Sequence, residues 1–555
     1  MHLSELQMYF VRACKEKNLK EVCFVPNKFM LYLYTIKSMK LSQVYYRLRK
    51  IMKMNCTIGS SAILQYQTVN RIVTISELDF DPVFLARFNV EEIMGNKVTF
   101  LHSSRNFSWN EDWNFKDKSA LWNFNLHYFE FLFPLLYAYK ETGNACYLEK
   151  SKTCIQSWVV MNPKNKKGAG WSSYTIALRL TNWLSYYEYI KNELDESFKK
   201  TMLDSMFEQY RHLSLHVEKD LLGNHYFENL KALLLCSIFF KDDLMFHKVL
   251  KEYKKECQEQ ILGDGMHFEL SPMYHKIIFE DVVRVAITLR ESGHKDNEIE
   301  SYIQPMLNVA WSLEEGLERI PLFNDSGNNV AKSLNSLVNV CETYFGLKPV
   351  YISQMKESGF YIFKFGQWKA IVDAGQPGPS YIPGHAHCDA MSFELFKNGK
   401  PVIVNCGTYG YQCEERGFFR STAAHNTVMI DGIEQSQCWA AFRLAKKSSL
   451  SILNIADTSI SMELTDQKGN KVQRTISIDD NYVSIKDLAK GHKLSVYYHF
   501  ASDISEDAYT VKENNVKISK EIMEYAEDYG EIKAVKSLRF EASDALTVTI
   551  TLDSI

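Results

Sequence analysis

Three short polar segments of this sequence carry side chains that could perform acid–base or metal chemistry. The densest lies at residues 384–393, GHAHCDAMSF, where His385 and His387 point the same way if the chain is extended. Two imidazoles on one face suit a metal half-site or an acid/base pair. Arg416, Arg420 and His425 follow, and arginines suit recognition of an anionic substrate. A solvated polar loop is the alternative, and the number of His and Arg side chains makes it less favoured.

Two further segments lie in the first half of the chain. At residues 223–229, GNHYFEN, Asn224 could simply cap the apolar helix that follows, but a cap requires neither His225 nor Glu228. At residues 264–275, DGMHFELSPMYH, a turn leads into a helix start that carries Tyr274. A tyrosine can act as a general base or acid if neighbouring cations lower its pKa from about 10. A packed tyrosine with a satisfied hydroxyl is the alternative.

The elements that must position these segments differ between the two halves of the chain. Residues 1–85 are typical of a helical preface, and residues 86–347 carry amphipathic helical patterns that recur as pairs, as in a toroid or solenoid. Residues 348–555 alternate between apolar and polar side chains, with turns at Asn398-Gly399 and Asp431-Gly432. We therefore predict an α+β multidomain fold: an N-terminal α/α toroid followed by a C-terminal antiparallel β-sandwich.

Composition excludes several other classes of protein. The 555 residues are 46% hydrophobic and 24% charged with a net charge of -3, which is typical of globular domains and gives no reason to expect a nucleic-acid partner. The 12 cysteines form no CxxC motif, which favours a reducing compartment. The N-terminus lacks the pattern of a secretory signal, and residues 22–41 are too interrupted by polar residues to span a bilayer. We expect a cytoplasmic protein, or a periplasmic or secreted one if a leader precedes this sequence. The sequence does not indicate the oligomeric state.

Together these segments resemble the heparinase II/III-like family of polysaccharide lyases. The most specific match is GHAHCDAMSFELFKNGKPVIVNCGTYGY followed by RGFFRSTAAHNTVMIDG, and the helical half adds LWNFNLHYFEFL, GWSSYTIALRLTNW, GNHYFENLKALLL and DGMHFELSPMYH in the same order. The resemblance implies an α/α toroid and a β-sandwich with the active site between them. It also implies cleavage of uronic-acid-containing polysaccharides by β-elimination, with no organic cofactor.

Roles for individual residues follow from matching these motifs. The resemblance implies that Asn224 and His225 neutralise the uronate carboxylate, and that Tyr274 and His385 are the catalytic acid and base. Such roles make chemical sense, because the C5 proton becomes acidic enough to remove only when the adjacent carboxylate is stabilised. We predict further substrate contacts at seven positions: Trp171, Tyr174, Arg179, Glu228, Tyr409, Arg416 and Arg420.

The resemblance also implies a zinc ion in some members, here at His387, Asn405 and His425. The position of Asn405 is expected to hold Asp, and a neutral amide is a poorer zinc ligand than a carboxylate. Cys406 is adjacent, but on a strand its side chain faces the other way. The site could instead be a hydrogen-bonded cluster without metal.

Two other functions remain open on the sequence. A glycoside hydrolase on the same scaffold needs two carboxylates, for which Glu228, Glu269 and Asp325 are available. A non-catalytic carbohydrate-binding protein of a capsule or exopolysaccharide system is the second alternative. We favour the lyase because all four predicted catalytic residues are present.

Overall fold

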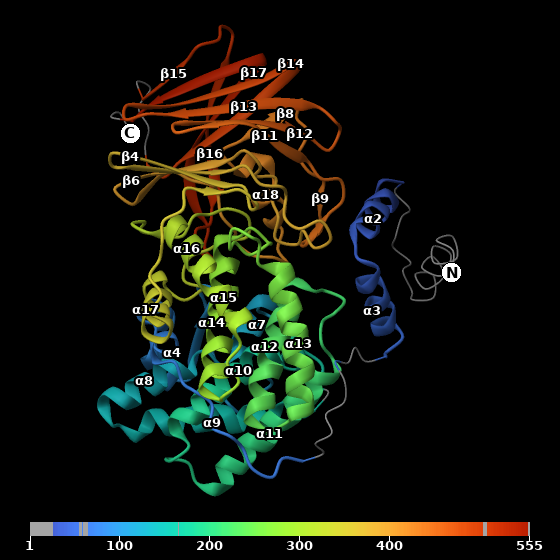
Figure 1. Cartoon of the computed structure of the whole chain (residues 1–555), viewed down its shortest axis with the longest axis vertical. Coiled ribbons are helices and arrows are strands. Elements are labelled where there is room, and N and C mark those ends of the chain that lie inside the picture. The colour runs from blue at the N-terminus through green and yellow to red at the C-terminus, as the bar shows by residue number, and fades with distance from the viewer. Residues whose placement is uncertain (1–25, 55–57, 59–64, 165, 503–507, 553–555) are drawn as a thin grey trace.

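The computed structural model describes residues 26–54, 58, 65–164, 166–502 and 508–552. Two helices, α2 (Pro26–Ser38) and α3 (Leu41–Ile51), come first and lie beside the body of the molecule, spanning its two halves (Figure 1). Trp439 of the strand half donates a hydrogen bond to Thr35 (3.0 Å), and Lys50 forms an ion pair with Asp220 of the helical half (3.3 Å). These helices therefore form an arm that contacts both halves. The N-terminal residues on which the signal-peptide prediction rests lie outside the described part.

Among the described residues up to 345, helices dominate, apart from one short β1–β2 hairpin. This half contains α4 (Ser76–Asp79), α5 (Pro82–Leu85), α6 (Val90–Met94), β1 (Lys97–Phe100), β2 (Ser103–Asn106), α7 (Ala120–Tyr128), α8 (Leu132–Thr142), α9 (Ala145–Met161), α10 (Ser173–Ile190), α11 (Glu196–Leu215), α12 (Gly223–Phe239), α13 (Asp243–Gln260), α14 (Pro272–Glu291), α15 (Asn297–Ser301), α16 (Ile303–Glu314) and α17 (Leu334–Phe345). Ile72, Leu78 and Phe84 belong to the same hydrophobic core as these helices, so the core crosses the predicted boundary at residue 85.

Helices α12 and α14 lie in the middle of this half and position two of the three polar segments. Nearly every side chain of α12 from Tyr226 to Phe239 is buried, as expected for a helix that is apolar on all sides. Helix α14 begins at Pro272, a residue suited to the first helical turn, and the Ser271 hydroxyl accepts a hydrogen bond from the backbone N–H of Tyr274 (3.2 Å). This cap fixes the start of α14 and so the position of Tyr274 in its first turn.

The second half is built from antiparallel strands. Its principal strands are β3 (Gln354–Met355), β4 (Phe360–Phe365), β5 (Trp368–Asp373), β6 (Phe393–Lys397), β7 (Lys400–Ile403), β8 (Val428–Ile430), β11 (Ser449–Ala456), β12 (Ser459–Thr465), β13 (Lys471–Ile478), β14 (Tyr482–Phe500), β15 (Tyr509–Val511), β16 (Lys517–Tyr525) and β17 (Lys533–Thr551). The short β9 (Cys438–Trp439) and β10 (Arg443–Leu444) pair separately, and a short helix, α18, covers Arg416–Phe419.

The long strand β14 joins two groups of strands into one continuous sheet. Its first part pairs with β13, its end pairs with β8 and β7, and β17 runs alongside for most of its length. Phe393 of β6 and Ile460 of β12, which lie on opposite sides of β14 in the strand order, share one hydrophobic core. The sheet therefore curls over itself, with the two groups stacked as in Figure 1.

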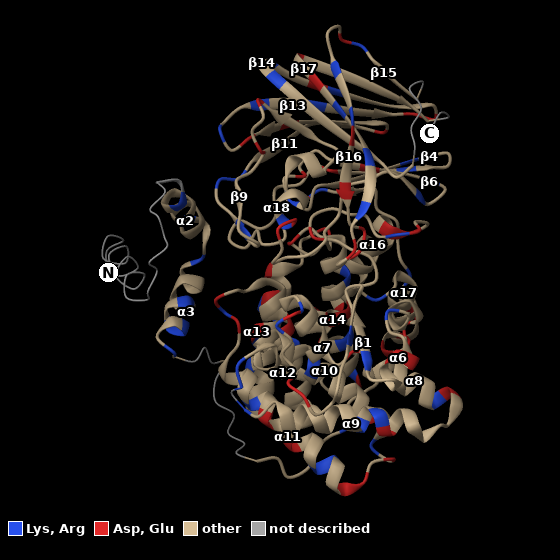
Figure 2. Ribbon diagram, turned by 180° about the vertical axis from the view of Figure 1, so that it is seen from behind, with Lys and Arg blue, Asp and Glu red and all other residues tan. Residues whose placement is uncertain are grey.

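Two smaller cores hold the halves against each other. In one of them Met273 and Tyr274 of α14 pack with Val404 and Phe419 of the strand half. Charged residues of both signs are interspersed over both halves (Figure 2). None of the helices among the described residues combines the length and the apolar character needed to cross a bilayer.

Candidate active site

A cavity of about 920 Å³ is lined by residues of both halves and of the N-terminal arm. Asn224, His225, Tyr274 and His385, the four predicted catalytic residues, all line it. The arm contributes Thr35, Met39 and Arg47 to its wall, a position that no sequence pattern predicted for the helical preface. Four segments far apart in the chain thus meet around one space that is large enough for several sugar residues.

Asn224 and His225 lie in the first turn of α12. The helix begins after Leu222 (φ 63°), and no side chain caps its first turn, so Asn224 is not the cap that the sequence allowed. Its side-chain amide makes no hydrogen bond within the described residues and faces the cavity. His225 Nδ1 lies 3.3 Å from Glu218 Oε2, and its ring packs on Tyr174 with 4.5 Å between the ring centroids. An uncommitted amide and an oriented imidazole are donors suited to a carboxylate.

Tyr274 and His385 face each other across the boundary between the halves, with their ring centroids 4.1 Å apart. The Tyr274 hydroxyl bonds that of Tyr411 (2.7 Å), which in turn bonds that of Tyr529 (2.8 Å). Burial, together with the nearby Tyr529, raises the pKa of Tyr274 well above its usual value. The condition stated for a tyrosine base or acid was a pKa lowered by neighbouring cations, and no described Lys or Arg pairs with this hydroxyl. Tyr274 is therefore a neutral phenol at rest.

Two histidines and an arginine around the site donate hydrogen bonds to the buried carboxylate of Asp325. It accepts hydrogen bonds from His385 Nδ1 (2.8 Å), His387 Nε2 (2.8 Å) and the Arg416 guanidinium (2.8 Å). Burial acts to raise the pKa of Asp325, but the Arg416 charge and the two imidazoles outweigh it and hold the pKa well below its usual value. Because Nδ1 of His385 carries the proton shared with Asp325, its Nε2 is the bare lone pair facing the cavity.

The sequence had named Asp325 only as a carboxylate available to a hydrolase. One signal that could have identified it was the run LFNDSG, in which polar residues interrupt an apolar stretch. In the structure, residues 322–327 of this run are all buried, so each polar side chain there requires a partner.

Four of the predicted substrate contacts do not line the cavity, because the protein itself occupies their polar groups. Arg179 is fully buried and bonds Gln209 and the carbonyls of His127 and Gly170. Arg420 donates to backbone carbonyls, including that of Ala386. The other two are Trp171, whose indole N–H donates to the Asn162 carbonyl, and Arg416, which pairs with Asp325. Helical or loop arginines in a sequence do not reveal whether their partner is a substrate or the protein itself.

Tyr174, Tyr409 and Glu228 do line the cavity. Glu228 is buried there and forms an ion pair with Lys231 (2.6 Å). Its carboxylate is thus already paired with a cation of the same helix.

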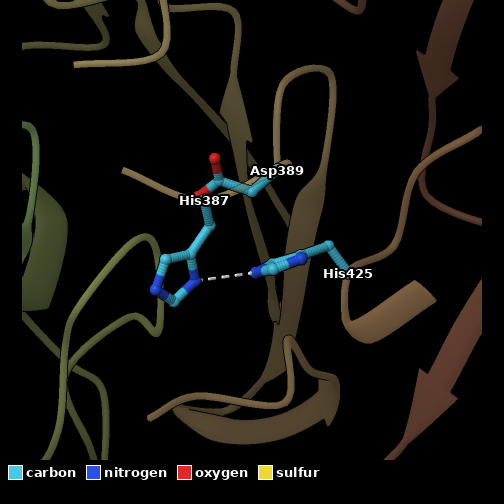
Figure 3. Close-up of side chains that lie close together, drawn as sticks. All are labelled: His387, Asp389 and His425. Carbon is cyan, nitrogen blue, oxygen red and sulfur yellow. Dashed lines mark hydrogen bonds between the residues drawn. The ribbon is translucent and has the colours of Figure 1, made fainter. Parts of the chain in front are cut away.

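A compact group of potential metal ligands lies behind His385. His387, Asp389 and His425 are buried and hold their ligand atoms within 4.8 Å of one another (Figure 3). His387 Nδ1 faces His425 Nε2 at 3.2 Å. His387 Nε2 donates to Asp325, and His425 Nδ1 donates to the Ser421 carbonyl (2.8 Å). In the neutral rings, both facing nitrogens are therefore lone pairs, which a cation would satisfy.

Asn405 does not fit its predicted role as the third ligand. Its side-chain oxygen accepts hydrogen bonds from the backbone N–H (3.1 Å) and the side-chain amide (3.3 Å) of Asn426. Asp389, which the sequence prediction had passed over, offers a carboxylate to the two histidines instead. Two imidazole nitrogens and one carboxylate oxygen form a donor set suited to zinc.

Comparisons with known proteins place this arrangement in context. A model of the heparinase II/III N-terminus matches residues 37–351, and a model of the heparinase II/III-like C-terminal domain matches residues 348–551. A heparin-sulfate lyase of Pedobacter heparinus is 25% identical over 357 residues, covering 58% of this chain and 53% of the relative. One of Bacteroides stercoris is 23% identical over 511 residues, covering 80% and 74%.

Solved structures of similar fold extend the comparison. A crystal structure of heparinase III superposes with a TM-score of 0.67 at 18% identity, covering 92% of this chain and 89% of that one. A heparan sulfate lyase from Pedobacter heparinus gives a TM-score of 0.56 at 16% identity, covering 92% and 87%. The chain spans between about half and three-fifths of the first two curated relatives that it matches.

Proposed function

The chain belongs to the heparinase II/III family, and from this premise we propose that it is a lyase that cleaves an acidic, uronic-acid-containing polysaccharide by β-elimination. The observation that carries the proposal is the pairing of His385 with Tyr274 in the cavity. His385 offers its Nε2 lone pair, because its Nδ1–H is hydrogen-bonded to Asp325. Tyr274 offers a phenolic proton, and the centroids of the two rings are 4.1 Å apart. Asn224 and His225 supply hydrogen-bond donors to the same space.

The reaction divides among these residues as follows. The uronate carboxylate binds to Asn224 and His225, which stabilise the charge that develops when the C5 proton leaves. His385 Nε2 takes that proton, and Tyr274 gives its own to the departing glycosidic oxygen. The electron pair of the C5–H bond forms the C4–C5 double bond as the C4–O bond breaks. The Tyr411 hydroxyl stabilises the Tyr274 phenolate that remains.

Within this proposal the helical half is an α/α toroid and the strand half a β-sandwich, with the substrate in the cavity between them. The adjacency of consecutive helices such as α12 and α13, and the core shared by strands on both sides of β14, support this finer description.

The proposal is tested by incubating the protein with a panel of uronic-acid polysaccharides and following ultraviolet absorbance. Elimination creates an unsaturated uronate that absorbs, whereas hydrolysis does not. We expect absorbing products from at least one polysaccharide, and their loss in Tyr274→Phe. Tyr525→Phe is the matched control, since Tyr525 is equally buried but bonds Glu527 away from the cavity. Reducing ends without absorbance would contradict the lyase.

We also propose that a divalent cation of the zinc type binds at His387, Asp389 and His425. When bound, it would supply positive charge behind the Asp325–His385 pair. Metal analysis of the purified protein should find a stoichiometric ion that is lost in Asp389→Asn and retained in Asn405→Ala. Retention in the first and loss in the second would restore Asn405 as the ligand.

A further inference from the structure

Glu269 lies at the carboxylate-binding end of the cavity and has no part in the mechanism above. It is 1% exposed and lines the cavity beside Asn224, whose backbone N–H lies 3.4 Å from Glu269 Oε1. The contact is close enough to require Gly223, since a Cβ there would lie 2.5 Å from the same oxygen. Leu222 (φ 63°) and Leu270 (φ 58°) adopt left-handed backbone next to these residues, a strain usually retained where geometry matters.

The other carboxylate oxygen of Glu269, Oε2, lies near two imidazole nitrogens and receives no hydrogen bond among the described residues. Its Oε2 lies 4.0 Å from His267 Nδ1 and 3.9 Å from His385 Nε2. Neither Glu269 Oε2 nor His267 Nδ1 has a hydrogen-bond partner within the described residues. Such unsatisfied buried acceptors are costly, and a single proton on the carboxyl would relieve the cost.

Hydrogen bonds elsewhere fix the tautomer of both imidazoles. The Gln260 amide nitrogen donates to the Gly223 carbonyl and to Glu256, so the Gln260 oxygen is an acceptor and receives the His267 Nε2 proton (3.1 Å). Nδ1 of His267 is then a lone pair, as is Nε2 of His385. A proton on Glu269 Oε2 would supply the donor that these three atoms lack.

Electrostatics agree with the geometry. Burial raises the pKa of Glu269, as does the Asp325 charge, while His385, His225 and the Asn224 N–H act in the opposite direction without cancelling the effect. Two tyrosines, Tyr274 and Tyr381, also face the carboxyl, and the nearby Glu269 contributes to the raised pKa of each phenol.

We propose that Glu269 is held as the neutral acid by His267, and that its neutrality allows Asn224 and His225 to receive an anionic uronate. The inference rests on the proposed lyase function and makes Glu269 a positioning residue. An ionised Glu269 beside Asn224 would repel the substrate carboxylate, in a setting where little water screens the two charges. Substrate binding should therefore weaken as pH rises and Glu269 loses its proton.

The pH dependence of KM and kcat tests this role. In the wild type we expect KM to rise several-fold toward alkaline pH. Glu269→Gln, which is neutral at every pH, should retain kcat and lose that rise. His267→Ala removes the acceptor that favours the neutral acid, so the rise should begin at lower pH. Glu188→Gln is the control. The Glu188 side chain is only 3% exposed, but it pairs with Lys191 and does not line the cavity, so its KM profile should match the wild type.

A second readout does not depend on turnover. The infrared absorption of protonated carboxyls at neutral pH should lose one component in Glu269→Gln and remain unchanged in Glu188→Gln. Burial also raises the pKa values of Asp281 and Asp373, so those carboxyls contribute to the remaining absorption. No difference between the spectra, a KM profile of Glu269→Gln parallel to the wild type, or loss of kcat at every pH in a folded Glu269→Gln would each overturn the inference. If the wild type forms no unsaturated product, the lyase proposal fails while the infrared comparison still decides where the proton resides.

Discussion

At the scale of single residues, the site depends on which polar atoms are already committed. Asn224 has an amide that no described residue uses, whereas the guanidinium groups of Arg179 and Arg420 are fully occupied by the protein. All three are buried polar residues, and the sequence assigned all three to the substrate. The uncommitted groups are the ones available to a ligand, since a buried polar group without a partner is costly in the free protein.

Asn224→Ala should therefore lower kcat by about 10²–10³-fold, the usual cost of losing one oxyanion-stabilising donor. The melting temperature should change little, because the amide makes no hydrogen bond in the described structure. Steady-state kinetics and a thermal melt of the same preparation check both. A large fall in melting temperature with unchanged kcat in the folded fraction would assign Asn224 to the fold instead.

Asp325 should make stability depend on acid pH. Its pKa is depressed in the folded state, so the unfolded state binds more protons between the folded value and about 4. The contribution is complete above pH ~4 and disappears as pH falls through the folded pKa. Asp325→Asn should cost about 3–5 kcal/mol at neutral pH because it strands the buried Arg416 charge, and the difference should narrow in acid. Denaturant unfolding of both proteins between neutral and acid pH measures this, and parallel curves would contradict it.

At the scale of elements, the N-terminal arm and the β9–β10 hairpin form one wall of the cavity. The guanidinium of Arg443 lies over the Trp439 ring (4.9 Å) and near Tyr32 of α2 (5.6 Å), and it pairs with no carboxylate among the described residues. Burial and the charge of Arg47 on α3 lower the pKa of Arg443. Two arginines that line one cavity from different elements are suited to an anionic group on the substrate.

Arg443→Gln should raise KM for an anionic polysaccharide by about tenfold or more, as expected from the loss of one charged hydrogen bond, with kcat nearly unchanged. The effect should weaken at high salt. Lys446→Gln is the control, because Lys446 packs over Tyr34 and does not line the cavity. An equal rise in KM in both variants would contradict a specific role for Arg443 and would indicate a general effect of losing positive charge.

At the scale of the whole molecule, periodicity in the sequence located the change from helices to strands, and the short motifs located the four residues that meet in the cavity. Their meeting could not be derived from the residues alone, because Tyr274 and His385 contact through packing between the halves. That Asp389 and not Asn405 has its side-chain oxygen beside the two histidines also could not be predicted, because Asn426 donates its hydrogen bonds to the Asn405 oxygen. The role of the arm as a cavity wall depended on Trp439, far away in the chain.

Cleavage of the glycosidic bond by elimination is tested most directly by the masses of the products. An oligosaccharide of uronic acid cut once by the wild type should yield two products whose masses sum to that of the substrate, because elimination adds no water. Tyr274→Phe should yield neither product. Products whose masses sum to the substrate plus one water molecule would identify a hydrolase and contradict the account.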